Sequence, residues 1–289
     1  MREFVDLHTH STASDGMVAP DELIRLAEAE KLAAVALTDH DTTAGLAAAR
    51  AAAAELPELR FVAGIEVSAT FSSGTLHVVG LGIDENAAPL RQLSARLRAA
   101  RDRRNPRIVA KLQAMGVKID MADVLAVASS WPQGDSRVVG RPHIAEAMRR
   151  SGCVATVEEA FDRYIGNGAP AYVPRQRPSS AEAVAAVRDA GGAAVLAHPV
   201  QLPCDKPGRL ERIVRSLIRE GLNGIEVYHT DHSDEQTARY LDLAGRLNLL
   251  VTGGSDFHGS TKPEARLGWP RVPIAAVSED LARRLLGRT

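Results

Sequence analysis

The chain has 289 residues, of which 45% are hydrophobic and 25% are charged, and its formal net charge is −1 at pH 7. This composition is typical of a globular protein, and the near-zero charge provides no basic field for long nucleic acid. No apolar stretch approaches the ~20 residues of a membrane-spanning helix, and the N-terminus shows no signal peptide, so we expect a cytoplasmic protein without a membrane partner. Cys153 and Cys204 form neither a disulfide framework nor a CxxC motif.

Strand and helix patterns alternate over the first 85 residues, which predicts parallel strands joined by helical crossovers. Proline and acidic residues open the first helix, as is typical of a helix N-terminus. The fourth strand follows the third after too few residues for a crossover, so we expect an antiparallel hairpin that brings His77 beside Glu66. In chain order, the predicted elements are a strand from Phe4, a helix at 20–30, a strand at 33–37, a helix at 43–55, and strands at 61–65 and 76–81.

Strand signals vanish between Asn86 and Tyr172, and we interpret residues 86–172 as an all-helical insertion over one end of the α/β domain. That domain is then formed by residues 1–85 and 173–289. The helical patterns of the insertion cover 90–103, 106–115, 121–127, 142–150 and 157–165. The later α/β elements are a helix from Ser179 or Ser180 to Ala190, a strand at 193–197, a helix at 207–220, a strand at 224–228, a helix at 233–246 and a strand at 249–252.

Histidine and carboxylate side chains recur at or near the same end of every predicted strand, where barrel enzymes collect their active sites. Side chains two residues apart in a strand point to the same side, so His8 and His10 can present two imidazoles to one point. Taken singly, each residue has an ordinary structural reading, and Asp15 before Gly16 could be a turn residue. Together they predict a site for two or three divalent metal ions. The nine residues are His8, His10, Asp15, His40, Glu66, His77, His198, Asp256 and His258.

Six short motifs resemble the successive motifs of the PHP (polymerase and histidinol phosphatase) family, and the resemblance covers the whole chain. They are His8-Thr9-His10, Thr38-Asp39-His40-Asp41, Gly64-Ile65-Glu66, Leu76-His77-Val78-Val79-Gly80, Ala197-His198-Pro199 and Ser255-Asp256-Phe257-His258. The insertion followed by Tyr172-Val173-Pro174 is similar to the bacterial 3′,5′-nucleoside bisphosphate phosphatases and 5′-to-3′ exoribonucleases.

The resemblance implies an α/β fold, a distorted seven-stranded β/α barrel, with a trinuclear site. Manganese is the expected metal, with Fe, Zn or Mg as alternatives. The family pattern assigns His8, His10, Glu66 and Asp256 to one metal, Asp15, His40 and His258 to a second, and Glu66, His77 and His198 to a third.

Candidate substrate residues are basic or aromatic. Arg137, Arg141 and His143 form a basic cluster in the insertion, and Arg175 and Arg177 follow Pro174. Because arginine can bind phosphate with two parallel hydrogen bonds, we expect substrate-phosphate contacts from Arg141, His143 and Arg175; the alternatives are a solvated helix start and a loop charge.

Catalytic roles are assigned to Asp256 and His229, and His229 could donate a proton to the leaving oxygen, bind phosphate or be a structural strand-end residue. Trp131 and Tyr172 could stack on a base, although core packing is the commoner role for such aromatic side chains.

These features lead to the hypothesis of a metal-dependent phosphoesterase in which a metal-bound hydroxide attacks phosphorus. The expected substrates are nucleoside 3′,5′-bisphosphates, which lose the 3′-phosphate, or short 5′-phosphorylated RNA degraded from its 5′ end. Near-neutral charge favours a short substrate over a long one. The alternatives are a histidinol phosphate phosphatase, a non-catalytic PHP interaction module and an amide-cleaving metallohydrolase. The oligomeric state stays open.

Overall fold

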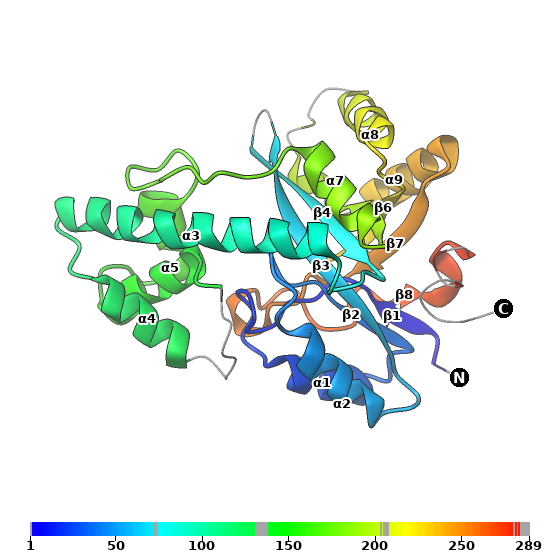
Figure 1. Cartoon of the computed structure of the whole chain (residues 1–289), viewed down its shortest axis with the longest axis horizontal. Coiled ribbons are helices and arrows are strands. Elements are labelled where there is room, and N and C mark those ends of the chain that lie inside the picture. The colour runs from blue at the N-terminus through cyan, green and yellow to red at the C-terminus, as the bar shows by residue number, and fades with distance from the viewer. Residues whose placement is uncertain are drawn as a thin grey trace.

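An eight-stranded sheet forms a nearly closed barrel (Figure 1). The computed structural model describes residues 2–71, 74–130, 138–202, 204, 208–279, 281 and 283. The strand order is β7-β6-β5-β4-β3-β2-β1-β8. The strands are β1 (Phe4–Asp6), β2 (Ala34–Leu37), β3 (Arg60–Phe71), β4 (Gly74–Leu81), β5 (Ala193–Leu196), β6 (Gly224–His229), β7 (Leu250–Gly254) and β8 (Val272–Pro273).

The barrel closes where β7 meets the segment that follows β1. The backbone N–H of Leu7 donates to the carbonyl of Gly253 at 3.1 Å, and Asp256 N–H donates to His8 O at 2.9 Å. A Cβ at position 254 would lie 2.4 Å from the His8 backbone nitrogen, so glycine is needed for this close approach. The predicted fold class is confirmed. No sequence pattern predicted the two-residue strand β8, which pairs antiparallel with β1, so the strand count is one higher than expected.

The β3–β4 hairpin is antiparallel, as predicted, and its register pairs Ser68 with His77. The prediction that the third strand ends before Glu66 is wrong, because β3 continues to Phe71. Beyond the end of β2, β4 supplies the hydrogen-bonding partner that keeps β3 extended. Glu66 therefore projects from inside a paired strand, and a parallel bridge joins it to His40.

Strand residues alternate between the inside of the barrel and the helices outside it, as the period of two requires. In β2, Ala34 and Ala36 belong to the inner apolar cluster, whereas Val35 and Leu37 pack in the outer one. The predicted start of α7 at Ser179 is confirmed by a capping box with Glu182. The surrounding helices are α1 (Pro20–Ala29), α2 (Leu46–Ala54), α7 (Ser180–Asp189), α8 (Arg209–Arg219) and α9 (Asp234–Leu247).

The helical segment between β4 and β5 has its own apolar core beside the barrel. Its elements are α3 (Ala88–Ala114), α4 (Met121–Ser130), α5 (Arg141–Arg150), α6 (Val157–Ala160) and a π-helical turn, η1 (Phe161–Ile165). Figure 1 shows α3 as a long helix that runs from the barrel to the region of α4 and α5. Leu93 and Leu97 in its first half pack in the outer barrel core. Ile108 and Leu112 in its second half belong to the core of the insertion.

The prediction of two helices separated near Pro106 is wrong, since α3 continues through this proline. An interior proline removes a hydrogen bond and costs ~3 kcal/mol. Ile108, Val109 and Leu112 are at most 3% exposed, and burying side chains of this size stabilises the fold by about 1.5–3 kcal/mol each, which outweighs that cost.

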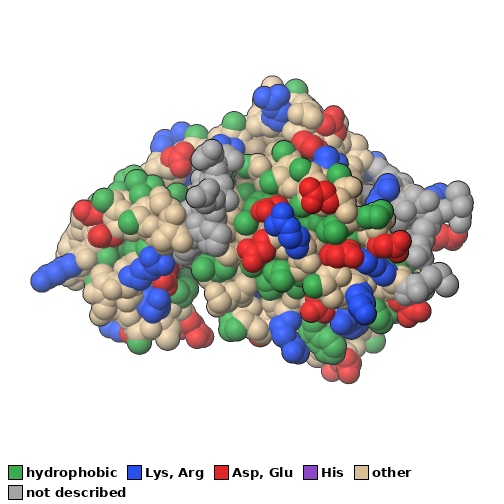
Figure 2. Space-filling model, turned by 90° about the horizontal axis from the view of Figure 1, so that it is seen from below, with side chains coloured by type: hydrophobic (Ala, Val, Ile, Leu, Met, Phe, Trp, Pro, Cys, Tyr) green, Lys and Arg blue, Asp and Glu red, His purple; other side chains and the backbone are tan. Residues whose placement is uncertain are grey.

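Acidic and basic side chains are interspersed on the face shown in Figure 2, and no histidine is visible there. In the described part of the chain, none of the helices combines the length and the apolar character needed to cross a membrane. Both cysteines are free thiols.

Candidate active site

All nine predicted ligand residues meet at one end of the barrel. His8 and His10 follow β1, His40 follows β2 and His198 follows β5. Five of the nine are buried and the others are partly covered. The side chains form several groups whose potential ligand atoms lie within 4.8 Å of one another; these include His10–Asp15–His40–His258, His8–His10–Asp256, His8–Glu66–His198 and His40–Glu66–His77.

His8, His10, Glu66 and Asp256 converge on one point. His8 Nε2 lies 3.5 Å from both Glu66 Oε2 and Asp256 Oδ1. His10 Nε2 lies 3.4 Å and 3.1 Å from the same two oxygens. Ligand atoms ~2.1 Å from a common ion in tetrahedral geometry stand about 3.4 Å apart, so the spacing fits a metal ion.

A second group surrounds Asp15. Its Oδ1 lies 3.5 Å from His258 Nε2, and its Oδ2 lies 3.9 Å from His40 Nε2. The His10 ring stacks on the His258 ring with centroids 4.1 Å apart, so the second group adjoins the first. Asp15 is therefore part of this cluster as well as of a turn.

Glu66 lies between the groups and is fully buried. Its Oε1 is 2.8 Å from His77 Nδ1 and 2.9 Å from His198 Nε2. Its Oε2 faces His8 and His10 and is 2.7 Å from His40 Nδ1. The two oxygens thus point to different sets of imidazoles, which is the arrangement that a bridging carboxylate requires.

Several of these atoms lack a hydrogen-bond partner in the described structure although they are buried: His8 Nε2, His10 Nε2, His40 Nδ1, Asp15 Oδ1 and Glu66 Oε2. Buried polar atoms are normally satisfied, so a set of orphaned imidazole and carboxylate atoms facing one another fits a divalent cation. The identity of the metal, the number of ions and the assignment of each ligand stay predictions.

The charges in the cluster support the same interpretation. Burial opposes ionisation of Glu66, but neighbouring imidazoles, first among them His40 and His77, hold its pKa well below the usual value. Burial also opposes protonation of His40, yet Glu66 and Asp15 raise its pKa to about 9. By contrast, burial and the nearby His258 and His40 lower the pKa of His10 to about 3. The carboxylates of the cluster therefore favour positive charge around them, but not every imidazole can be protonated. Bound cations would supply the remaining positive charge.

His229 faces the same cluster. Its Nδ1 accepts a hydrogen bond from the Asp231 backbone N–H at 3.0 Å, so the ring hydrogen belongs on Nε2, which points to Asp256 Oδ2 at 3.6 Å. Strict alternation along β6 would put Glu226 and His229 on opposite faces. A register irregularity between Glu226 and Tyr228 lets both side chains face the site, as bulges near active sites do. His229 is thus a buried N–H donor at the rim of the metal cluster.

Lys262 is a site residue that sequence reasoning missed. Its Nζ lies 2.9 Å from Asp256 Oδ2 and 3.2 Å from Asp231 Oδ2. Burial alone would lower its pKa, but these two carboxylates raise it. Lys262 follows the short helix η3 (Gly259–Thr261), in a loop without a periodic pattern, so the sequence contained no signal for this contact.

Beside the metal cluster lies an arginine cluster formed by Arg101, Arg104, Arg141, Arg175 and Arg177. Arg101 and Arg175 both donate to Asp41 Oδ2, the latter at 2.7 Å. Burial first, and then the neighbouring guanidinium groups, lower the pKa of Arg104 to about 8. A bound anion would relieve repulsion of this kind among buried cations.

Sequence reasoning missed Arg101, Arg104 and Asp41 in this cluster. Arg101 and Arg104 lie in the middle of α3, where they interrupt the apolar pattern between the two cores. Asp41 has a left-handed backbone with φ 60°, and its Oδ1 accepts from Ser68 N–H at 2.9 Å. The only sequence signals were buried-position arginines in a helix and the aspartate next to His40.

The other candidate substrate residues have more local contacts. Arg141 donates to Ile165 O at 3.2 Å, and its guanidinium lies over the rings of Phe161 and Tyr172. Tyr172 thus packs against an arginine. His143 is fully buried, and its Nδ1 accepts from the Gly140 N–H at the start of α5. Substrate contacts of Arg141, His143 and Arg175 stay predictions. Trp131 and Arg137 lie outside the described residues.

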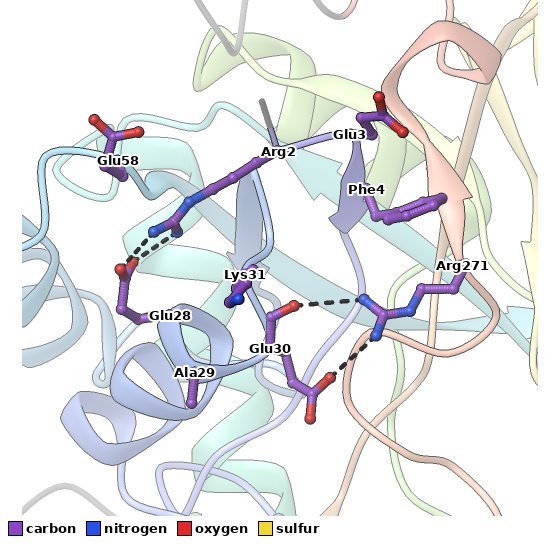
Figure 3. Close-up of a pocket in the computed structure, with 9 residues that line it drawn as sticks. All are labelled: Arg2, Glu3, Phe4, Glu28, Ala29, Glu30, Lys31, Glu58 and Arg271. Atoms are coloured by element: carbon purple, nitrogen blue, oxygen red, sulfur yellow. Dashed lines mark hydrogen bonds and ion pairs between the residues drawn. The ribbon is translucent and has the colours of Figure 1, made fainter.

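A separate pocket lies at the opposite end of β1, around Phe4 (Figure 3). Its arginines are already paired: Arg2 binds the Glu28 carboxylate, and Arg271 contacts Glu30. The groups of potential metal ligands in the described residues all lie at the histidine-rich end of the barrel and not in this pocket, so the candidate active site is the histidine-rich end.

Comparison with known proteins agrees with the site. The PHP domain model matches residues 6–119. The 3′,5′-nucleoside bisphosphate phosphatase of Chromobacterium violaceum is 37% identical over 88% of this chain and 87% of that protein. The 5′-3′ exoribonuclease of Haemophilus influenzae is 32% identical over 89% of this chain and 91% of its own length.

A crystal structure from Bifidobacterium adolescentis, assigned as a metal-dependent phosphoesterase, superposes with a TM-score of 0.85 at 35% identity and covers 98% of this chain and 95% of that one. The match extends over nearly the whole of both chains and so includes the barrel and the helical insertion. The chain therefore belongs to the PHP domain family and is a hydrolase of phosphoric esters.

Proposed function

We propose that this phosphoesterase removes the 3′-phosphate of nucleoside 3′,5′-bisphosphates and acts in the same way at the 5′ end of short 5′-phosphorylated RNA. Both substrates carry a 5′-phosphate and a scissile ester on the 3′ oxygen. The activities named for the Chromobacterium and Haemophilus relatives support this choice.

One observation carries the proposal: the arginine cluster and the imidazole–carboxylate cluster adjoin each other through consecutive residues. His40 belongs to the imidazole–carboxylate cluster, and the next residue, Asp41, holds Arg101 and Arg175. A substrate with two phosphates can thus place the scissile one among His8, His10 and Asp256 and the other among the arginines. Arginine binds terminal phosphates well because its planar fork matches two phosphate oxygens.

Divalent cations at the nine-residue cluster would make water acidic enough to act as the nucleophile and would neutralise charge on the phosphoryl oxygens. The chain itself supplies orientation and proton transfer. His229 Nε2–H is directed at Asp256 and can donate to a leaving oxygen that lies beside that carboxylate. Arg101 and Arg175 fix the distal phosphate, which orients the ester for in-line attack.

The test is phosphate release from adenosine 3′,5′-bisphosphate by the Mn-loaded protein, with the position of the remaining phosphate determined by chromatography. The comparison substrates are 3′-AMP, histidinol phosphate and a 5′-phosphorylated RNA pentamer. We expect 5′-AMP as the product and turnover of the pentamer from its 5′ end. Little release is expected from 3′-AMP, which lacks the group that the arginines bind.

Preferential turnover of histidinol phosphate would contradict the substrate assignment but leave the phosphoesterase in place. Equal turnover of 3′-AMP and the bisphosphate would contradict the proposed role of the arginine cluster in binding the 5′-phosphate. Binding of metal without turnover of any of these esters would favour a non-catalytic PHP module.

A further inference from the structure

Glu226 is a buried carboxylate that contacts two predicted metal ligands from opposite sides. It lies in β6 and is 2% exposed. Its Oε1 is 3.0 Å from His8 Nδ1, and its Oε2 accepts the backbone N–H of His198 at 2.7 Å. Each carboxylate oxygen therefore contacts a different predicted ligand residue, and the two ligand residues follow different strands.

These contacts form part of a closed ring of four residues. His8 Nε2 faces Glu66 Oε2 at 3.5 Å, and Glu66 Oε1 faces His198 Nε2 at 2.9 Å. Glu226 closes the ring between the backbone N–H of His198 and the ring of His8. In the family pattern, Glu66 is shared by the His8 group, which includes His10 and Asp256, and the His198 group, which includes His77. The ring would therefore join both groups through two carboxylates, Glu66 inside the cluster and Glu226 behind it.

The contact at His198 restrains an unusual backbone conformation. His198 has φ 24° and ψ 68°, a region that residues with a side chain rarely adopt. It lies between the end of β5 at Leu196 and the short helix η2 (Pro199–Gln201), so its N–H is outside the backbone hydrogen-bond pattern of both elements. The Glu226 carboxylate accepts that N–H and holds the imidazole in the direction of Glu66.

The contact at His8 fixes the tautomer of the ring. A carboxylate only accepts hydrogen bonds, so His8 must carry a hydrogen on Nδ1, and Nε2 is then the atom that would bind a cation beside Glu66 and Asp256. Carboxylates behind ligand histidines orient the ring and raise its basicity.

We propose that Glu226 is a positioning residue that couples cation binding at the His8 group to cation binding at the His198 group. The proposal rests on the metal centre assumed in the proposed function. When a cation holds His8 in place, Glu226 is fixed at Oε1, and its Oε2 then restrains His198. A cation bound at either group therefore restrains the ligand histidine of the other group through Glu226. Glu226 itself needs no contact with substrate.

Glu226→Gln tests this with little change in volume. An amide has one acceptor oxygen and an NH2 group, so it can accept from His8 or from His198 but not from both. The matched control is Glu235→Gln, which changes an exposed carboxylate in α9. The metal-free wild type and both variants are titrated with MnCl2, free Mn²⁺ is counted by electron paramagnetic resonance, and folding is verified by circular dichroism.

In the wild type and the control, we expect the Mn²⁺ ions of the His8 group and the His198 group to bind in one cooperative step. In Glu226→Gln, affinity for both ions should fall by about 10- to 100-fold, the effect typical of losing a partner behind a ligand, and the cooperativity should disappear. Unchanged binding, or a loss confined to one ion, overturns the coupling. A wild type that binds no Mn²⁺ at all overturns the metal centre and the inference together.

A second measurement does not depend on how the variant folds. In the Zn-loaded wild type labelled with ¹⁵N at histidine, we expect the His8 ring to be protonated at Nδ1 and to show a hydrogen-bonded proton signal. A His8 ring protonated at Nε2 overturns the proposal, because Glu226 would then have no hydrogen to accept.

Discussion

The two charged clusters of the site differ in how they are built. The imidazole–carboxylate cluster projects from strand ends of a hydrogen-bonded barrel, so the sheet itself fixes its geometry. The arginine cluster comes from the middle of α3, the start of α5 and the segment after Val173, and α3 contributes to both the barrel core and the insertion core. In the proposed function, catalysis therefore takes place on the barrel, whereas substrate recognition depends on how the two cores are held together.

The largest effect on the imidazole–carboxylate cluster is expected from a change at Glu66, the carboxylate shared by the predicted metal groups. Glu66→Gln should lower phosphate release by at least about 1,000-fold, which corresponds to ~4 kcal/mol of barrier, and should reduce bound metal. Assays of turnover and of metal content check this, with Glu235→Gln as the control. Retention of full metal content would contradict the central position of Glu66.

Leucine-to-alanine substitutions in the two cores test whether the two charged clusters depend on units that unfold separately. We propose that the insertion, residues 86–172, unfolds separately from the barrel. Leu97→Ala and Leu112→Ala should each cost about 2–5 kcal/mol, since both side chains are buried. Leu112→Ala should weaken binding of the bisphosphate while metal is retained; Leu97→Ala should weaken metal retention. A single unfolding transition that both variants lower equally would make the two cores one cooperative unit.

Removal of arginines should affect recognition alone. Arg175→Met should raise KM for adenosine 3′,5′-bisphosphate by about 10- to 100-fold, the loss of one or two charge-assisted hydrogen bonds, and leave the metal content unchanged. Arg103→Met, on the exposed side of α3, is the matched control. If KM for 3′-AMP rises equally, Arg175 does not discriminate the 5′-phosphate.

The smallest expected effect concerns pH and the metal-free protein. Burial opposes the charge on His40, but Glu66 and Asp15 raise its folded pKa to about 9 from 6.5. A raised histidine pKa contributes stability below pH 6.5 that is lost as pH rises through 9. The free energy of unfolding of the metal-free protein should therefore fall as the pH rises from 6.5 to 9.

Bound metal should reverse this trend, because cations compete with protons for the same ligands. Urea unfolding at several pH values, with and without Mn²⁺, measures both slopes. Parallel slopes with and without Mn²⁺ would show that His40 does not exchange a proton for a cation.

The same contrast explains what could be predicted from the sequence. His8, Glu66 and Asp256 follow or lie in strongly patterned strands, and the common polarity of parallel strands brings their ends together. Arg101 and Lys262 have no such pattern: Arg101 is a buried polar residue where the apolar spacing of α3 is interrupted, and the position of Lys262 depends on the path of a loop. Glu226 looked like an ordinary strand residue, because only the bulge in β6 turns it and His229 to the same side.

The position of the insertion has a consequence for how the chain folds. β4 pairs with β3 through a tight hairpin, but its other neighbour, β5, arrives only after about 110 residues. The entropy of closing a loop rises slowly, by ~0.6 kcal/mol for each doubling of its length. The free-energy cost of bringing β4 and β5 together therefore changes little with the number of residues between them. This connection is the place where the chain can gain or lose length at least cost to its stability.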